Sequence, residues 1–128
     1  MNALTPYNKF LAPEFKFNQS FVDYILYDNQ DLTPWWFFAQ SANYIEYWCT
    51  TVQKLYPMRN LVPFANWIYT DDIVCFDGSD KSCDPKVFYI HAFASPGWEG
   101  RGCVDNFSDW LLIAKKDSHD YKAELNAN

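Results

Sequence analysis

Residues 72–93, DIVCFDGSDKSCDPKVFYIHAF, contain the pattern that decides the fold of this chain. Along 72–77 and again along 86–93, side chains alternate between two faces, and this period of two predicts two β-strands. About eight residues separate the strands, and they are rich in Gly, Ser, Asp and Pro, which favour turns. The segment therefore predicts an antiparallel hairpin with a long acidic loop.

The segment NFSDWLLIAKK, residues 106–116, predicts the clearest helix. Asn106 suits the cap position, while Asp109 in the first turn and two lysines in the last turn suit the helix dipole. We expect the polar residues 119–128 to form a tail that frays. The buried stripe of the helix is expected to comprise Phe107, Trp110, Leu111 and Ala114.

The aromatic-rich residues 34–40 allow two interpretations. A helix from Pro34 onward fits, because apolar residues continue from there at spacings of three and four. The cluster WWFF is instead typical of a strand, and Ser41 is a good cap for a shorter helix over 41–55. We favour a short strand near 35–39 followed by that shorter helix.

The other segments are expected to be short or irregular. Residues 1–16 form an irregular lead-in, and 19–27 form a helix capped by Asn18. Residues 61–65 contain a proline, which lacks a backbone N–H, so they form an edge strand or an extended connector. Residues 94–106 hold three of the four glycines of the chain and are expected to form a loop.

Together these elements predict one α+β domain spanning residues 1–128, with helices packed against a small antiparallel sheet of about four strands. A chain of 128 residues, 49% of them hydrophobic, is large enough to bury a core. No apolar window has the length of a membrane span, and the first residues lack the pattern of a signal peptide. A cytoplasmic location is expected.

The charge of the chain bears on its partners. A net charge of −6 argues against direct binding to nucleic acid or to anionic membranes, and is compatible with a basic protein partner. Residues 71–109 carry eight acids and three bases, so this segment alone accounts for −5. Trp98 lies among these acids, where it either anchors a partner or folds back over the sheet edge. The candidate partner-binding residues are Asp77, Asp80, Asp84, Trp98, Glu99 and Asp105.

Catalytic and metal-binding patterns are weak in this sequence. Asp71 and Asp72 are adjacent at the start of a strand, so they point to opposite faces and are expected to fix the turn. Cys75 and His91 lie on neighbouring strands, but no third group that would orient them can be identified. The acidic loop lacks the ligand order of a calcium site, and no cysteine or histidine spacing matches a zinc site. We therefore expect no cofactor, no metal and no enzymatic activity.

Two stretches resemble the SUKH superfamily. LVPFANWIYTDDIVCFDG, residues 61–78, is similar to its signature of a Pro-Phe-Ala triplet followed by a strand aspartate and a Phe-Asp pair. VFYIHAFASPGWEGRGCVDNFSDWL, residues 87–111, resembles its closing strand, variable loop and last helix. The chain departs from the pattern at Asp71, where a glycine is usual, and in a longer loop at 94–105.

This resemblance implies a function as well as a fold. The superfamily includes yeast regulators of cell-wall synthesis of the Smi/Knr type and many bacterial immunity proteins of polymorphic toxin systems. An immunity protein binds a cognate toxin, often a nuclease, and neutralises it by stoichiometric masking. The resemblance therefore implies a non-enzymatic immunity protein with a basic toxin as partner, and the alternative is a regulatory or scaffold domain that binds several proteins.

Overall fold

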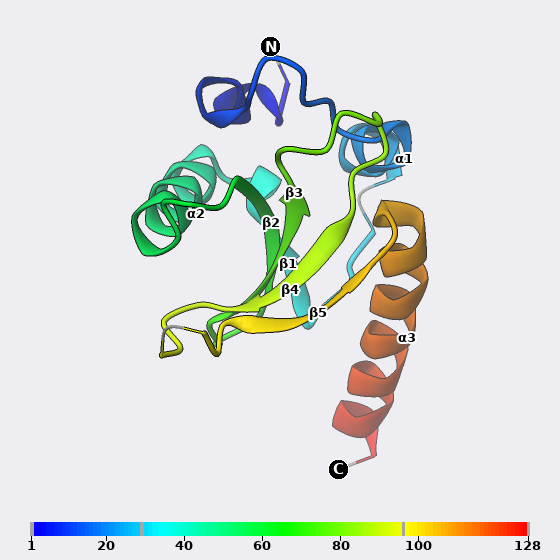
Figure 1. Cartoon of the computed structure of the whole chain (residues 1–128). Coiled ribbons are helices and arrows are strands. Elements are labelled where there is room, and N and C mark those ends of the chain that lie inside the picture. The colour runs from blue at the N-terminus through cyan, green and yellow to red at the C-terminus, as the bar shows by residue number, and fades with distance from the viewer. Residues whose placement is uncertain (1, 29, 96, 128) are drawn as a thin grey trace.

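The computed structural model describes residues 2–28, 30–95 and 97–127. Within them, a five-stranded antiparallel sheet lies between two layers of helices: α2 covers one face, and α1 and α3 cover the other (Figure 1). The strands follow one another in the order β1-β2-β3-β4-β5. The α+β class is confirmed, and the sheet has five strands where about four were expected.

The predicted hairpin forms the centre of the sheet. It consists of β3 (Asp72–Asp77) and β4 (Val87–His91), which pair in antiparallel register. The other strands are β1 (Trp35–Phe37), β2 (Leu61–Trp67) and β5 (Gly100–Val104). The helices are α1 (Gln19–Asp23) with its π-helical continuation η2 (Tyr24–Asp28), α2 (Ala42–Leu55), α3 (Phe107–Asn126) and the 3-10 helices η1 (Thr5–Phe10) and η3 (Phe38–Gln40).

The face covered by α1 and α3 holds an aromatic core. Phe64 of β2 stacks on Phe76 of β3 with ring centroids 4.3 Å apart, and Trp110 of α3 meets Phe64 edge to face at 5.1 Å. Phe21 of α1 and Phe107 of α3 pack against the same two phenylalanines. All five side chains are fully buried, so this cluster joins both helices to the sheet.

The opposite face packs against α2 and η1. The buried residues of α2 are Ile45, Trp48, Cys49 and Val52. Cys75 of β3 is buried on this side of the sheet. The predicted irregular lead-in is partly wrong, because it contains η1 and the fully buried Tyr7. The Tyr7 hydroxyl donates a hydrogen bond of 2.7 Å to the carbonyl oxygen of Pro63, which ties the N-terminal segment to β2.

The position of β2 corrects the prediction of an edge strand at 61–65. The strand is longer, from Leu61 to Trp67, and it lies between β1 and β3. β1 pairs only with residues 65–67, so Pro63 has a strand neighbour on one side alone. The register also shifts between Pro63 and Ala65. Proline has no backbone N–H, and it is tolerated here because no hydrogen bond between the strands requires an N–H at this irregularity.

The loop predicted over 94–106 contains the fifth strand. β5 pairs with β4 through Val87–Val104, Phe88–Cys103 and Ile90–Gly100, with a bulge between the last two pairs. Gly102 lies in that bulge at φ 110°, a conformation that favours glycine. Most β5 side chains are exposed, so backbone pairing rather than apolar burial makes this strand, and the sequence carries little signal of it.

The predicted fraying of residues 119–128 is wrong for the described part of that segment, because α3 continues to Asn126. Ser118 is buried, and two contacts tie this half of the helix to the first residue of β1 and to the segment before it. The indole Nε1–H of Trp35 donates to Asp117, and the Lys122 ammonium donates to the carbonyl oxygen of Asp31. Lys115 and Lys116 consequently lie in the middle of the helix and not in its last turn.

The predictions at the helix starts have mixed outcomes. The Asn106 side chain accepts a hydrogen bond of 2.9 Å from the N–H of Asp109, so that cap is confirmed. Asn18 and Ser41 occupy the cap positions of α1 and α2, but neither side chain makes a capping hydrogen bond. The strand interpretation of residues 34–40 is confirmed in shorter form, since η3 follows β1 at Phe38.

Candidate functional site

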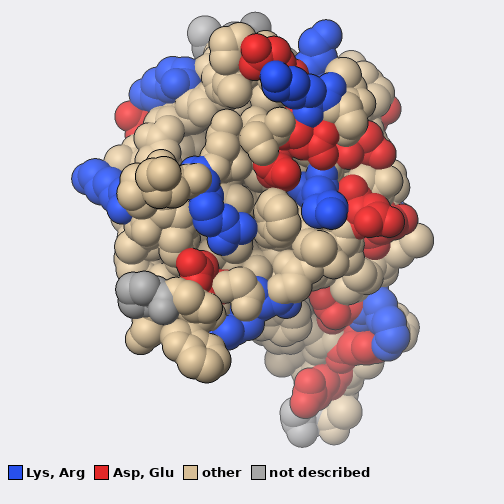
Figure 2. Space-filling model, in the orientation of Figure 1, with Lys and Arg blue, Asp and Glu red and all other residues tan. Residues whose placement is uncertain are grey.

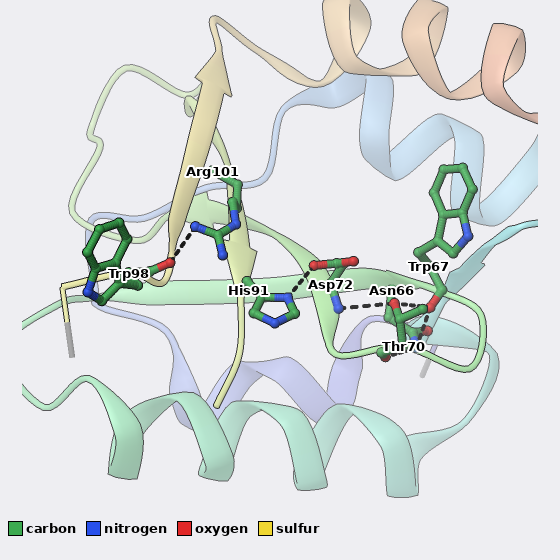
Figure 3. A network of polar contacts seen from close by, with 7 residues as sticks. All are labelled: Asn66, Trp67, Thr70, Asp72, His91, Trp98 and Arg101. Atoms are coloured by element: carbon green, nitrogen blue, oxygen red, sulfur yellow. Dashed lines mark hydrogen bonds and ion pairs between the residues drawn. The ribbon is translucent and has the colours of Figure 1, made fainter. Parts of the chain in front are cut away.

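Two connections lie side by side at one end of the sheet. We call them the loop end: residues 68–71 between β2 and β3, and residues 92–95 and 97–99 between β4 and β5. The N–H of Ala92 donates to the carbonyl oxygen of Asp71 at 2.9 Å, and the N–H of His91 donates to that of Glu99 at 2.7 Å. The first bond ties the two connections to each other, and the second ties the end of the β4–β5 connection to β4. Figure 3 shows the polar contacts around them.

The connection between β2 and β3 is held by Asn66 and Thr70. The hydroxyl and the N–H of Thr70 both donate to the carbonyl oxygen of Trp67, at 2.8 and 3.0 Å. The side-chain amide of Asn66 reaches the carbonyl oxygens of Trp67 and Thr70 at 3.4 Å (Figure 3). The turn therefore depends on an amide and a hydroxyl, and not on the aspartate carboxylates that were expected to fix it.

Asp71 and Asp72 have separate roles. Asp71 is exposed, and its backbone carbonyl oxygen accepts a hydrogen bond from the N–H of Ala92. Asp72 starts β3, and its Oδ1 lies 2.5 Å from Nδ1 of His91 on β4, the residue opposite it in register. A cross-strand pair of this kind positions the His91 ring at the loop end (Figure 3).

The loop end exposes three large aromatic side chains, those of Tyr69, Phe93 and Trp98. Their exposed fractions are 94%, 54% and 68%. Tyr69 and Phe93 both have φ of 65°, which is a strained conformation for a bulky side chain. Phe93 lies 6.5 Å from the Trp48 ring of α2, and Tyr69 lines a hollow of about 300 Å³ with Trp36 and Tyr44. Tyr69 and Phe93 therefore combine a strained backbone conformation with an exposed aromatic ring.

Replacing Tyr69 tests this strain. The Tyr69→Gly variant is expected to be more stable than Tyr69→Ala by about 1 kcal/mol, because both lose the ring and only glycine relaxes at positive φ. The free energies of unfolding would be compared by urea denaturation. A glycine variant less stable than the alanine variant would contradict the assignment of strain to this position.

The acidic residues predicted to bind a partner lie mostly at the other end of β4. Asp77 accepts hydrogen bonds from the N–H and the hydroxyl of Ser79, at 2.9 and 2.6 Å. Asp80 accepts from the N–H groups of Ser82 and Lys86, and the hydrogen bonding by Ser82 lowers its pKa. These carboxylates therefore shape the loop that carries them.

Asp84 links two distant segments of the same region. Its two carboxylate oxygens accept hydrogen bonds from the side-chain amides of Asn18 and Asn106, at 2.9 and 3.0 Å. This contact joins the β3–β4 loop to the starts of α1 and α3. The carboxylate of Asp105 is exposed beside it, after the last residue of β5.

The six candidate residues thus fall into two groups. Asp77, Asp80, Asp84 and Asp105 lie at the acidic end, around residues 78–86, whereas Trp98 and Glu99 lie at the loop end. The length of β4 separates the groups by about 15 Å at the usual rise per residue. Figure 2 shows acidic side chains gathered over the acidic end and the start of α3, with basic side chains between them. Trp98 does not fold back over the sheet edge, since 68% of it is exposed.

The nucleophile pair considered from sequence does not form. Cys75 is opposite Phe88 and His91 is opposite Asp72, so the register places their side chains on different faces of the sheet. Burial raises the pKa of the Cys75 thiol, and burial also raises that of Cys49 to about 12. Both thiols are therefore protonated at neutral pH. All four cysteines are free, including Cys83 and Cys103 at the surface.

Three further observations concern the described residues. None of their His, Cys, Asp and Glu side chains form a group of three or more that could hold a metal ion. None of the helices found among them has the length and apolar character needed to cross a membrane. Sequence reasoning missed Tyr69 and Phe93, whose only signal was a large aromatic residue beside turn-forming residues in a polar connection.

Comparison with known proteins identified no match for this chain. No protein-family model, no curated protein and no solved structure matches the chain.

Proposed function

We propose that this protein is a non-enzymatic, cytoplasmic immunity protein that binds a cognate basic toxin and neutralises it by stoichiometric masking. The resemblance of residues 61–78 and 87–111 to the SUKH superfamily supports this role. The proposed partner is a protein, and the proposal involves no direct binding to nucleic acid, to a membrane or to a cofactor. A nuclease is the kind of toxin that suits an acidic inhibitor, because a surface that binds phosphates is positively charged.

The observation that carries the proposal is the set of exposed aromatic rings at the loop end. Aromatic side chains are enriched at the centres of protein interfaces, where each ring buries a large area with few rotatable bonds. Tyr69, Phe93 and Trp98 project from connections that backbone hydrogen bonds hold in place. A preorganised surface of this kind loses less conformational entropy when a partner binds.

The charge of the protein supports the choice of a basic partner. Asp71 and Glu99 lie at the loop end, and the formal net charge of the whole chain is −6. Opposite net charges accelerate the encounter of two proteins, and salt screens this effect. Association with the toxin is therefore expected to slow as the salt concentration rises.

Affinity capture tests the proposal. The protein would serve as bait in its source cells, with its neighbouring genes co-expressed, and eluates at low and high salt would be compared by mass spectrometry. One stoichiometric basic partner that is lethal without this protein is the expected result. Several ordinary cellular proteins would favour the regulatory or scaffold alternative. An association rate with the captured toxin that does not change with salt concentration would contradict the proposed electrostatic attraction.

A further inference from the structure

A groove of about 350 Å³ runs between the sheet and α3, beside the loop end. Three aromatic residues from three strands line it: Trp35 of β1, Trp67 of β2 and Tyr89 of β4. The Trp35 ring lies 5.3 Å from that of Trp67 and 6.3 Å from that of Tyr89. Ile113 of α3 lies along the same groove and is 40% exposed.

Two carboxylates also line this groove, Asp72 of β3 and Asp117 of α3. Oδ1 of Asp72 contacts His91, and Oδ2 of Asp117 accepts the indole hydrogen bond from Trp35 at 3.0 Å. The second oxygen of each carboxylate accepts no hydrogen bond from any residue that the structure describes. Each carboxylate can therefore accept a further donor without losing its present contact.

No lysine or arginine within residues 2–28, 30–95 and 97–127 comes within 4.0 Å of either carboxylate. Arg101 lines the groove, but its guanidinium donates to the carbonyl oxygen of Trp98 at 2.6 Å (Figure 3). Burial, and after it the charge of Asp117, raises the pKa of Tyr89 to about 12, so its hydroxyl stays protonated beside that charge. The groove thus combines aromatic walls with two carboxylates whose only ionisable nitrogen neighbour within 4.0 Å, among the described residues, is that of His91 at Asp72.

We propose that this groove binds an arginine side chain of the basic partner. A guanidinium is planar, so it stacks on indole and phenol rings, and its N–H groups reach carboxylates on either side. The free oxygens of Asp72 and Asp117 would accept those hydrogen bonds, while Trp67 and Tyr89 would flank the guanidinium plane. This assignment rests on the proposed function for the identity of the partner, and the groove itself can be tested without it.

The binding test uses Nα-acetyl-arginine amide as the probe and its neutral isostere, Nα-acetyl-citrulline amide, as the control. The indole N–H signals of Trp35 and Trp67 would be followed by NMR during titration of the folded protein. Saturable shifts of both signals with the arginine compound, and much smaller ones with citrulline, are expected. Equal affinity for the two compounds would overturn the proposal, because the carboxylates would then contribute nothing.

Four variants locate the binding. Asp72→Asn and Asp117→Asn are each expected to weaken binding of the arginine probe about three- to fivefold, the effect of a partly exposed ion pair. Asp109→Asn removes the same charge from an exposed residue in the first turn of α3 and is the matched control, expected to leave the affinity unchanged. Arg101→Gln removes a competing positive charge and is expected to strengthen binding. An equal loss in Asp109→Asn would overturn the proposal, since net charge alone would explain the result.

The arginine assignment and the proposed function fail in different ways. If Asp117→Asn leaves the affinity for the toxin unchanged, the assignment of an arginine of the toxin to the groove is refuted, and the proposed immunity function is unaffected. Binding of the arginine probe without any captured basic partner would support the groove and refute the function. Equal binding of Nα-acetyl-lysine amide would overturn the choice of arginine, because a lysine ammonium cannot stack and donate as a planar fork does.

Discussion

Replacing Phe76 by alanine is expected to lower the free energy of unfolding by about 3–5 kcal/mol, the range for removing a large aromatic side chain from a packed core. Phe76 is fully buried at the centre of the aromatic face, with Phe64 stacked on it at 4.3 Å. Rings from α1, from α3 and from the N-terminal segment also contact it. The cavity would be shared by all these elements, so none of them could fill it by moving alone.

Urea denaturation followed by tryptophan fluorescence would measure the loss. Phe76→Leu is the graded control, expected to cost less because it keeps most of the buried volume. Met58→Ala is the surface control, since Met58 is 96% exposed and such positions change stability by about 0.5 kcal/mol or less. A loss for Phe76→Ala as small as that of Met58→Ala would show that the aromatic face is not the cooperative core described above.

The parts of the fold that follow from local pattern were predictable from the sequence. Alternation along 72–77 and 86–93 identified the central hairpin, and the spacing after Asn106 identified the start of α3. In these segments the buried side chains have the period of the element itself, so the pattern and the packing agree. The cap at Asn106 was predictable for the same reason, because it depends on residues three positions apart.

The elements that were missed depend on distant partners. β5 exists because β4 offers backbone groups to pair with, and a segment such as GRGCV shows no alternation of its own. The end of α3 is stabilised by contacts with Asp31 and Trp35, far away in the chain. Pro63 is compatible with an interior strand only because β1 is too short to reach it. Such contacts cannot be inferred from local periodicity.

The candidate site was only partly predictable for a similar reason. The acids of residues 77–84 were visible as a cluster, but the structure engages their carboxylates in the turns of the loop and in the link to Asn18 and Asn106. Residues of all five strands and of α3 line the groove, so they are scattered along the sequence. Two interpretations of Trp98 were open from the sequence, an anchor for a partner or a cover over the sheet edge, and its 68% exposure in the structure excludes the cover.

Replacing Trp98 by alanine is expected to weaken binding of the captured toxin by about 2 kcal/mol or more, which corresponds to roughly a thirtyfold rise in Kd. The ring is 68% exposed and makes no aromatic contact with any part of the chain that the structure describes. The hydrogen bond with Arg101 uses the backbone carbonyl of Trp98, so the substitution leaves it in place. The loss of affinity should therefore appear without a loss of stability.

Surface plasmon resonance with each variant would measure the change in Kd, and thermal unfolding would check that the fold is intact. Tyr27→Ala is the matched control, because Tyr27 is an aromatic residue that is 81% exposed in η2, outside the loop end. Trp98→Phe should retain part of the affinity, since the smaller ring keeps much of the contact area. If Trp98→Ala and Tyr27→Ala weakened binding equally, the loop end would not be the interface, and the carboxylates of the acidic end would become the surface to test next.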